Sequence, residues 1–306
     1  PAKGIHIMVP QSAFETNSAL FLPTLDGRYV FVVPWQRAVM IGTTDTGYAG
    51  DNDNPLANVD EVDYLISVVN SYSGARKISR DDVIASWAGL RPLVGTPPSE
   101  SGQATGSVSR EHLIYVGPYK VVGLLGGKLT NYRIMSDEVL TKLFAEHPDL
   151  AARATPSRTA RTMLGGFDDK QDFLTATAHI AARARKLSIE PATLDHLIAS
   201  YGKDADEILS IVEKEPELAD RVCPDFPPIM AEIPFCIVNE SAMLLEDLLF
   251  RRMRMGLVHQ GQCLDAVPRV ASLVRSCLGW DEARTKVEIE NTQSIINEHI
   301  AASHTF

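Results

Sequence analysis

The chain has 306 residues, of which 45% are apolar and 22% charged, a composition typical of a globular protein large enough for two domains. Its formal net charge of −10 argues against a nucleic-acid-binding protein, since such proteins usually present a basic surface. No apolar stretch approaches the roughly 20 residues that cross a bilayer, and four cysteines without C-x-x-C spacing are typical of reduced thiols in a cytoplasmic protein.

The first half of the chain is predicted to be rich in strands. Short runs of β-branched residues, bounded by Gly, Pro or Asp, predict strands at residues 5–9, 29–33, 38–41, 113–116 and 121–125. Apolar residues at helical spacing predict helices at 59–70 and about 132–144. Residues 95–109 are rich in Gly, Pro and Ser and are predicted to form a loop.

The second half is predicted to be wholly helical. The expected helices cover residues 172–185, 191–201, 204–213, 231–238, 241–255, 264–277 and 281–302. Pro156, Gly165 and Gly166 lie in the stretch that links the two halves. The sequence therefore predicts an α+β protein with a strand-rich domain at 1–150, a mixed sheet plus helices, and an all-helical domain at 151–306.

A pair of glycines followed by lysine is the most informative local motif. Gly126 and Gly127 precede Lys128-Leu129-Thr130, after an apolar run and before a predicted helix. Glycines at a helix start let backbone approach an electron-rich ligand closely. Leu129 stands where a phosphate-binding P-loop needs Ser or Thr, which excludes that site, and no G-x-G-x-x-G occurs in the chain.

Three other side chains are candidates for chemistry. His6 lies in an otherwise apolar strand, where it is either a general base or a core histidine. Arg91 lies between apolar residues and a proline, so we expect it to have an anionic partner, either a substrate or a structural ion pair with Asp81 or Asp82. Arg110 follows the polar loop and is either an anion ligand or an exposed loop arginine.

Several short motifs, taken together and in order, resemble those of the FAD-dependent glycerol-3-phosphate dehydrogenases. The matching segments of the first half are Lys3-Gly4-Ile5-His6-Ile7-Met8-Val9-Pro10, Ile41-Gly42-Thr43-Thr44-Asp45, Ala88-Gly89-Leu90-Arg91-Pro92-Leu93, Ser109-Arg110-Glu111-His112 and Gly126-Gly127-Lys128-Leu129-Thr130. In the helical half, Tyr201-Gly202, Ala231-Glu232-Ile233 and Leu278-Gly279-Trp280-Asp281 continue the likeness. The family's N-terminal segment, with its glycine-rich FAD loop, is not in this sequence, so the chain is expected to be a fragment.

The resemblance implies a strand-rich substrate and flavin-site domain followed by an all-α cap domain. It implies oxidation of sn-glycerol 3-phosphate to dihydroxyacetone phosphate, hydride transfer to FAD and electron transfer to a membrane quinone. Catalytic roles are implied for His6 and Arg91. Substrate binding is implied for Arg91, Arg110 and Lys128, and cofactor binding for Gly126, Gly127, Lys128, Leu129 and Thr130.

The resemblance also implies a cytoplasmic protein, peripheral on the inner face of the membrane, and a homodimer. No metal ion is expected, because the histidines lack metal-ligand spacing, and the net charge argues against nucleic acid. A glycerol-3-phosphate oxidase that uses O₂ is the alternative enzyme, although the long insertion that such oxidases tend to carry is not present here. The remaining alternative is an inactive folded fragment without bound cofactor.

Overall fold

A computed structural model of the chain describes residues 2–74, 76–91 and 111–304. The chain forms two compact units, each defined by the contacts among its own residues. Unit 1 comprises Pro1–Ile5, Thr44–Pro55 and Ala88–Thr162, and unit 2 comprises His6–Thr43, Leu56–Trp87 and Met163–Phe306. The domain boundary at residue 150 stays a prediction.

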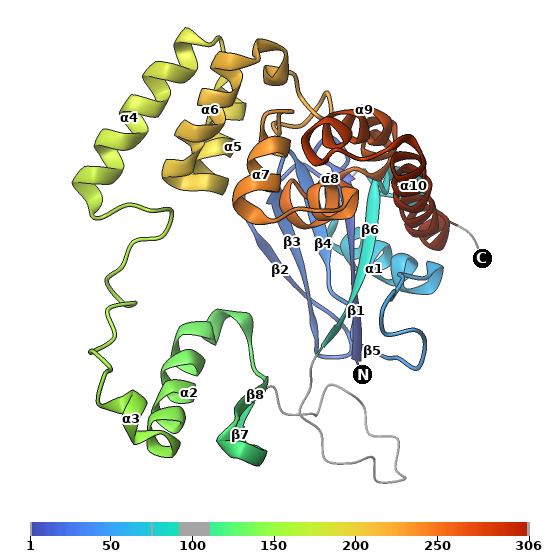
Figure 1. Cartoon of the computed structure of the whole chain (residues 1–306). Helices are drawn as coiled ribbons and strands as arrows, with labels where there is room; N and C mark the ends of the chain where they lie inside the picture. The colour runs from blue at the N-terminus through green and yellow to red at the C-terminus, as the bar shows by residue number, and fades with distance from the viewer. Residues whose placement is uncertain (1, 75, 92–110, 305–306) are drawn as a thin grey trace. The chain divides into compact units, whose positions relative to one another are not determined.

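The first half contains a six-stranded sheet in the order β2-β3-β4-β1-β5, with β6 also paired to β1 (Figure 1). Its strands are β1 (Ala2–Pro10), β2 (Leu20–Pro23), β3 (Tyr29–Trp35), β4 (Ala38–Gly42), β5 (Thr46–Gly47) and β6 (Ala85–Arg91). β1 runs antiparallel to β4 and β5, and β3 runs antiparallel to β2 and β4. The sequence of β1 is apolar on both faces, and almost all of it is buried, as a central strand requires.

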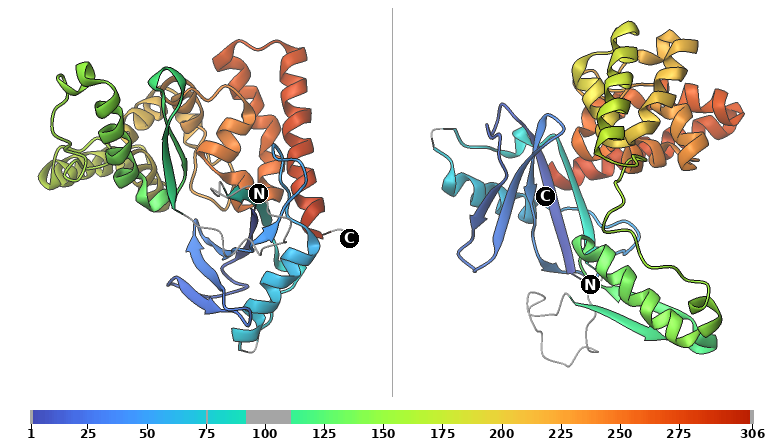
Figure 2. Two further views of the ribbon diagram at one scale, coloured as in Figure 1. Left: turned by 90° about the horizontal axis from the view of Figure 1, so that it is seen from below. Right: turned by 90° about the vertical axis from the view of Figure 1, so that its left-hand side faces the viewer.

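Helix α1 (Val59–Tyr72) packs against β2 and β3 of this sheet. Figure 2 shows this helix beside the strands. It begins with a capping box, in which the Asn58 side chain accepts from the Glu61 N–H and the Glu61 carboxylate accepts from the Asn58 N–H. The apolar residues that predicted this helix, including Val62, Leu65 and Val69, form its buried face.

Within unit 1, β7 (His112–Val116) and β8 (Val122–Gly126) form an antiparallel hairpin. A short 3₁₀ turn, Pro118–Lys120, connects them between the two predicted strands. The chain then passes through a second 3₁₀ turn, Leu129–Asn131, into α2 (Tyr132–Glu146) and the short α3 (Pro148–Ala151). The predicted strand pair and the helix after it are confirmed.

From residue 170 onward the described residues form helices and one isolated β-bridge, which confirms the helical second half. The α-helices are α4 (Lys170–Lys186), α5 (Pro191–Tyr201), α6 (Ala205–Lys214), α7 (Glu232–Glu240), α8 (Met255–Val258), α9 (Gln260–Leu278) and α10 (Glu282–His304). No helix of the described ranges is both long and apolar enough to span a membrane.

One predicted helix, at 241–255, is confirmed only in part, since only residues 245–252 of it form a continuous helical stretch. The chain there leaves α7 at Ser241, which has a left-handed backbone, and forms a π-helix at Asp247–Arg252. The Asp247 carboxylate accepts from the N–H groups of Met243 and Leu244, which holds this stretch as a turn before the π-helix. Arg254, again left-handed, separates the π-helix from α8.

Three strands are not predicted from the sequence. β2 and β5 have four and two residues, too few for a periodic pattern to appear. β6 reads Ala-Ser-Trp-Ala-Gly-Leu-Arg, without a β-branched residue, so its extended backbone depends on pairing with β1 and not on local propensity.

A buried polar cluster joins helices of unit 2. Glu232, fully buried on α7, accepts from the Tyr201 hydroxyl at 2.6 Å and contacts the His196 Nε2 at 2.9 Å. Its other oxygen accepts from the Ile229 N–H at 2.7 Å. Burial, together with the neighbouring carboxylate, raises the pKa of Tyr201 far above its ordinary value, so this hydroxyl stays a donor. The cluster ties α5 to α7 because each polar group is satisfied by another.

Gly202, which follows α5, lies close to the backbone of Gly165 and provides a stability test of that contact. It has φ +60°, and a Cβ there would lie 2.3 Å from the carbonyl oxygen of Gly165. Gly202→Ala should therefore lower the free energy of unfolding by more than about 3 kcal/mol, because backbone must move and the conformation is strained.

The control is Gly279→Ala, since Gly279 also has a positive φ but no neighbouring atom within 4 Å of the position that an added Cβ would take. It should cost only about 1–2 kcal/mol. Urea unfolding followed by circular dichroism measures both variants, and equal losses would exclude a steric role for the Gly165 contact.

Candidate functional site

His6 lies on β1 opposite Gly42 of β4, within unit 2. A Cβ on Gly42 would come within 2.3 Å of the His6 Cδ2, so the half-buried imidazole occupies space that only glycine leaves open. The ring also lies parallel to the indole of Trp87, with centroids 5.3 Å apart and an interplanar angle of 12°. His6 is thus a half-buried histidine with a defined ring plane, not one enclosed in the core.

Arg91 ends β6, within unit 1, and its guanidinium is held from two sides. Nη1 lies 3.3 Å from the Asp45 Oδ1, and Nη2 donates to the Thr44 carbonyl oxygen at 2.8 Å. The partner of this ion pair is Asp45, in place of the predicted Asp81 or Asp82, and Asp82 pairs with Arg76. The Arg91 side chain remains 21% exposed, so it is oriented by the protein and still reached by solvent.

The segment after β4, singled out in the sequence only as part of the family resemblance, supplies these contacts. Thr44 is buried, and its hydroxyl accepts from the Ile5 N–H at 3.0 Å, while its carbonyl accepts from Arg91. Asp45 therefore belongs with the candidate site residues, as a group that orients Arg91. The sequence signal that could have identified it is a carboxylate directly after a strand end that carries small hydroxyl residues.

The glycine pair lies where β8 ends, also within unit 1. Gly126 and Gly127 have φ +71° and +87°, which other residues rarely adopt. A Cβ on Gly127 would lie 2.3 Å from the Met135 Sδ, so glycine also allows α2 to pack closely. The next three residues, Lys128-Leu129-Thr130, are exposed, and Leu129 is 87% exposed.

Arg110, together with the predicted loop at 95–109, lies outside the described residues. His6 is described within unit 2, and Arg91, Lys128 and the glycine pair within unit 1. Among residues 2–74, 76–91 and 111–304, no group of three His, Cys, Asp or Glu side chains could hold a metal ion.

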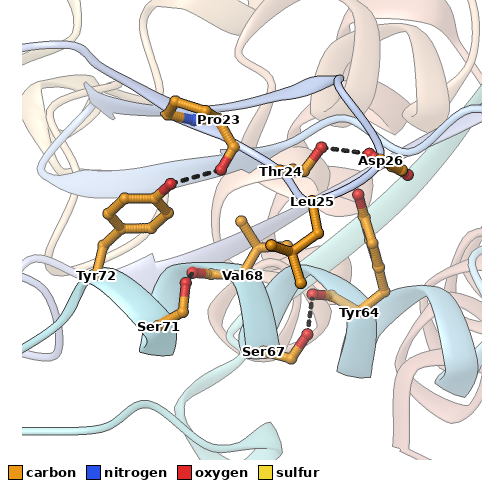
Figure 3. A pocket seen from close by; sticks show the side chains of 9 residues that line it. All are labelled: Pro23, Thr24, Leu25, Asp26, Tyr64, Ser67, Val68, Ser71 and Tyr72. Atoms are coloured by element: carbon orange, nitrogen blue, oxygen red, sulfur yellow. Dashed lines mark hydrogen bonds between the residues drawn. The ribbon is translucent and has the colours of Figure 1, made fainter.

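A cavity of about 520 Å³ lies between the β2–β3 turn and α1 and contains none of the predicted site residues (Figure 3). Its hydroxyl groups are used internally: Ser67 donates to the Tyr64 carbonyl at 2.8 Å, and Tyr72 donates to the Pro23 carbonyl at 2.6 Å. A binding site normally directs a few polar groups at its ligand. This cavity is therefore not the candidate site.

Comparisons with known proteins divide the chain much as its secondary structure does. Residues 1–133 match the family model of FAD dependent oxidoreductases, and residues 157–285 match the C-terminal domain of alpha-glycerophosphate oxidase. A glycerol-3-phosphate dehydrogenase of Synechocystis sp. is 30% identical over 302 residues, covering 97% of this chain and 53% of that protein. The mitochondrial enzyme of Bos taurus is 30% identical over 302 residues, covering 97% of this chain and 40% of that protein.

The X-ray structure of the glycerol-3-phosphate dehydrogenase from Bacillus halodurans, complexed with FAD, has a similar fold. It superposes with a TM-score of 0.78 at 23% identity, covering 100% of this chain and 58% of that one. The chain thus spans about half the length of the curated relatives that it matches.

The cysteines differ sharply in accessibility. Burial raises the pKa of Cys223 to about 12, and it raises the pKa values of Cys236 and Cys263 as well. Cys277 is exposed, and its pKa is raised by partial desolvation. All four are free thiols. Because the thiolate is the reactive form, three of them are protected both by burial and by protonation.

We expect a thiol reagent to modify one cysteine rapidly in the native chain and all four after denaturation. Cys277→Ser should abolish the rapid phase, and its rate in the unmodified sequence should rise about tenfold per pH unit below the thiol pKa. A colorimetric thiol assay measures these rates. Two or more rapid thiols in the native protein would contradict the buried positions of Cys223, Cys236 and Cys263.

Proposed function

We propose, because the chain belongs to the family of FAD-dependent glycerol-3-phosphate dehydrogenases, that it supplies the substrate-side residues for oxidation of sn-glycerol 3-phosphate to dihydroxyacetone phosphate. The observation that carries the proposal is 30% identity to a relative of that name over 302 residues, which is 97% of this chain. The geometry of His6 and of Arg91 fits the roles that this reaction requires.

The residues around the glycine pair fit a flavin. Exposed Leu129 offers an apolar contact, Lys128 a positive charge, and the backbone at the start of the Leu129–Asn131 turn can approach a planar ring. FAD, when bound, accepts the hydride from C2 of the substrate. In this proposal Gly126, Gly127, Lys128, Leu129 and Thr130 contact the flavin, and Lys128 stabilises the negative charge that develops there.

His6 removes the proton from the C2 hydroxyl as the hydride leaves. A neutral imidazole nitrogen is a suitable acceptor near pH 7. The open space over Gly42 and the parallel Trp87 indole restrict the ring plane, so that the accepting nitrogen keeps one direction. The proton then passes from His6 to solvent.

Arg91, with Arg110, binds the phosphate or the polarised oxygen of the substrate. A planar guanidinium suits such oxyanions because it presents paired N–H donors. The Asp45 carboxylate and the Thr44 carbonyl fix the plane of Arg91 before substrate arrives. Lys128 adds a third positive charge on the substrate side.

The electron acceptor in this proposal is a membrane quinone, which the chain reaches by peripheral association on the inner face, as a homodimer. The dehydrogenase names of the relatives favour an electron acceptor other than O₂. The description of the family that residues 157–285 match names an oxidase, which favours O₂ as the second candidate. Oxygen uptake without added quinone, at the rate of substrate oxidation, would favour the oxidase.

The activity is tested in protein that contains bound FAD, supplied if needed by joining the chain to the remaining part of the Bacillus halodurans relative. Anaerobic addition of glycerol 3-phosphate should bleach the flavin, and dihydroxyacetone phosphate should form in equal amount. Glycerol at the same concentration should bleach it far more slowly. No bleaching by glycerol 3-phosphate would refute the proposed substrate.

His6→Asn in this protein should lower kcat by about 10² to 10⁴, the usual contribution of a general base, with a small effect on KM. His179→Asn is the matched control, because His179 is 64% exposed on α4. Steady-state kinetics measures both. An unchanged kcat with a lowered Tm would return His6 to a purely structural role.

Arg91→Ala should lower kcat/KM for glycerol 3-phosphate, with a loss of about 3–5 kcal/mol of transition-state stabilisation, because an oriented cationic partner of the anion is lost. The loss for glycerol should be much smaller. Arg76→Ala removes a more exposed arginine and serves as the control. Equal losses with both substrates would exclude a phosphate role for Arg91.

The 306-residue chain by itself should be colourless and inactive. Tight FAD binding depends on a glycine-rich strand–turn–helix at the pyrophosphate, and the sequence contains no G-x-G-x-x-G. The contacts around Gly126 reach only the ring system, which offers too little to offset immobilising a large ligand. Gel filtration after incubation with excess FAD tests this, and stoichiometric co-elution of flavin would contradict it.

A further inference from the structure

We propose that Trp87 is a positioning residue for the His6 imidazole, and that Gln260 of α9 holds the strand segment that carries Trp87. The inference deepens the proposed function, because it rests on His6 acting as the base. All three residues belong to unit 2, so their contacts are described within one compact body.

The contact between Trp87 and His6 restricts the one soft torsion of the imidazole. Rotation about χ2 is broad for histidine, so a surface histidine samples many ring planes. Here the plane lies within 12° of the indole plane, at a centroid distance of 5.3 Å. The ring also fills the space where a Gly42 Cβ would be, so neighbours from β4 and β6 both limit its rotation.

Trp87 is itself held by contacts of the helical region. Its side chain packs against the hydrophobic core to which Met8 and Ala85 also belong. One residue before it, Ser86 is fully buried and is bound through its backbone by Gln260. A strand fixed at Ser86 leaves little freedom to the side chain that follows.

Gln260 acts on β6 as a neighbouring strand would. Its side-chain Nε2 donates to the Ser86 carbonyl at 2.8 Å, and its Oε1 accepts from the Ser86 N–H at 3.3 Å. Its own backbone N–H donates to the Ile84 carbonyl at 2.9 Å. Gln260 is 1% exposed, so water cannot replace its hydrogen bonds. A side chain with both a donor and an acceptor is therefore required at this position. A truncated side chain would leave the buried backbone groups of Ser86 unpaired.

A purely structural role of Trp87 and a positioning role predict different effects of substitutions at residue 87. If Trp87 only fills the core, a large apolar replacement preserves the environment of His6, apart from general loss of stability. If it positions the imidazole, a flat ring at residue 87 is needed, and aliphatic replacements release the ring plane while the fold persists.

The test uses NMR of histidine side chains in the 306-residue chain, which needs no flavin. The His6 ring signals are assigned by their loss in His6→Asn. Ring currents of the stacked indole should move the chemical shifts of these signals away from those of exposed histidines. Trp87→Phe should retain part of this change in chemical shift, and Trp87→Leu should abolish it. Trp35→Leu is the control, because Trp35 packs against the same core but pairs with Ala38 at the other end of β4.

Gln260→Leu provides the second variant and should give broadened or multiple His6 signals with Trp87 still present. In FAD-containing protein, Trp87→Leu should lower kcat about 10- to 100-fold with KM changed less than about threefold, and Trp87→Phe should restore most of the rate. The proposal would be overturned if the His6 chemical shifts in the unmodified chain were those of an exposed histidine. It would also be overturned if Trp87→Leu had the same His6 chemical shifts and the same kcat as the unmodified protein. If Trp87→Leu does not fold, His6 signals unchanged in both Trp87→Phe and Gln260→Leu would overturn it.

These outcomes separate the inference from the proposed function. A normal kcat in His6→Asn would refute His6 as the base, whatever the NMR result. Normal His6 signals in the Trp87 variants, with a low kcat in His6→Asn, would leave the base in place and remove Trp87 as its positioning residue.

Discussion

The pairing of β1 with β4 is the constraint on which the candidate site depends. It places His6 opposite Gly42, the one neighbour on β4 that leaves room for an imidazole. A shift of one residue would turn His6 to the other face of the sheet. Burial of Ile5, Ile7 and Met8 opposes such a shift, since each fully buried aliphatic side chain contributes about 1.5–3 kcal/mol. The buried apolar residues of this strand thus set the direction of the His6 side chain.

The same turn that follows β4 serves two purposes. Thr44 binds the Ile5 N–H through its hydroxyl and the Arg91 guanidinium through its carbonyl. The Asp45 carboxylate adds a charged contact, which lowers the net positive charge but fixes the guanidinium plane. An arginine that is already oriented loses less side-chain entropy on binding an anion. In our proposal, Asp45 orients Arg91 but partly neutralises its positive charge. Arg110 and Lys128 supply the further positive charge that binds the substrate anion.

Polar groups, and not apolar packing alone, connect the helical region to strand β6. Gln260 completes the hydrogen bonds of Ser86, and the Ser86 hydroxyl donates to the His299 carbonyl at 3.3 Å. The fully buried Glu232 plays a comparable role between α5 and α7. Such groups are directional, so they specify one arrangement of helices more strictly than apolar contacts do.

The sequence by itself predicted elements whose signal is local. Helices α1, α4, α5, α6, α7, α9 and α10 follow from apolar periodicity. The turn at Gly126 and Gly127 follows from their backbone freedom. The likeness of ordered motifs also predicted the family correctly. These inferences succeed because each depends on residues a few positions apart.

Only the tertiary structure decided which residues meet. The Arg91 contact with Asp45 joins residues 46 apart, and the Gln260 contact with Ser86 joins residues 174 apart. β6 has no local strand signal and is extended because β1 pairs with it. The 241–255 stretch has a helical pattern, yet the Asp247 carboxylate and the left-handed Ser241 and Arg254 interrupt it. Hydrogen bonds and ion pairs between distant residues leave no periodic trace in the sequence, because each partner alone is compatible with many others.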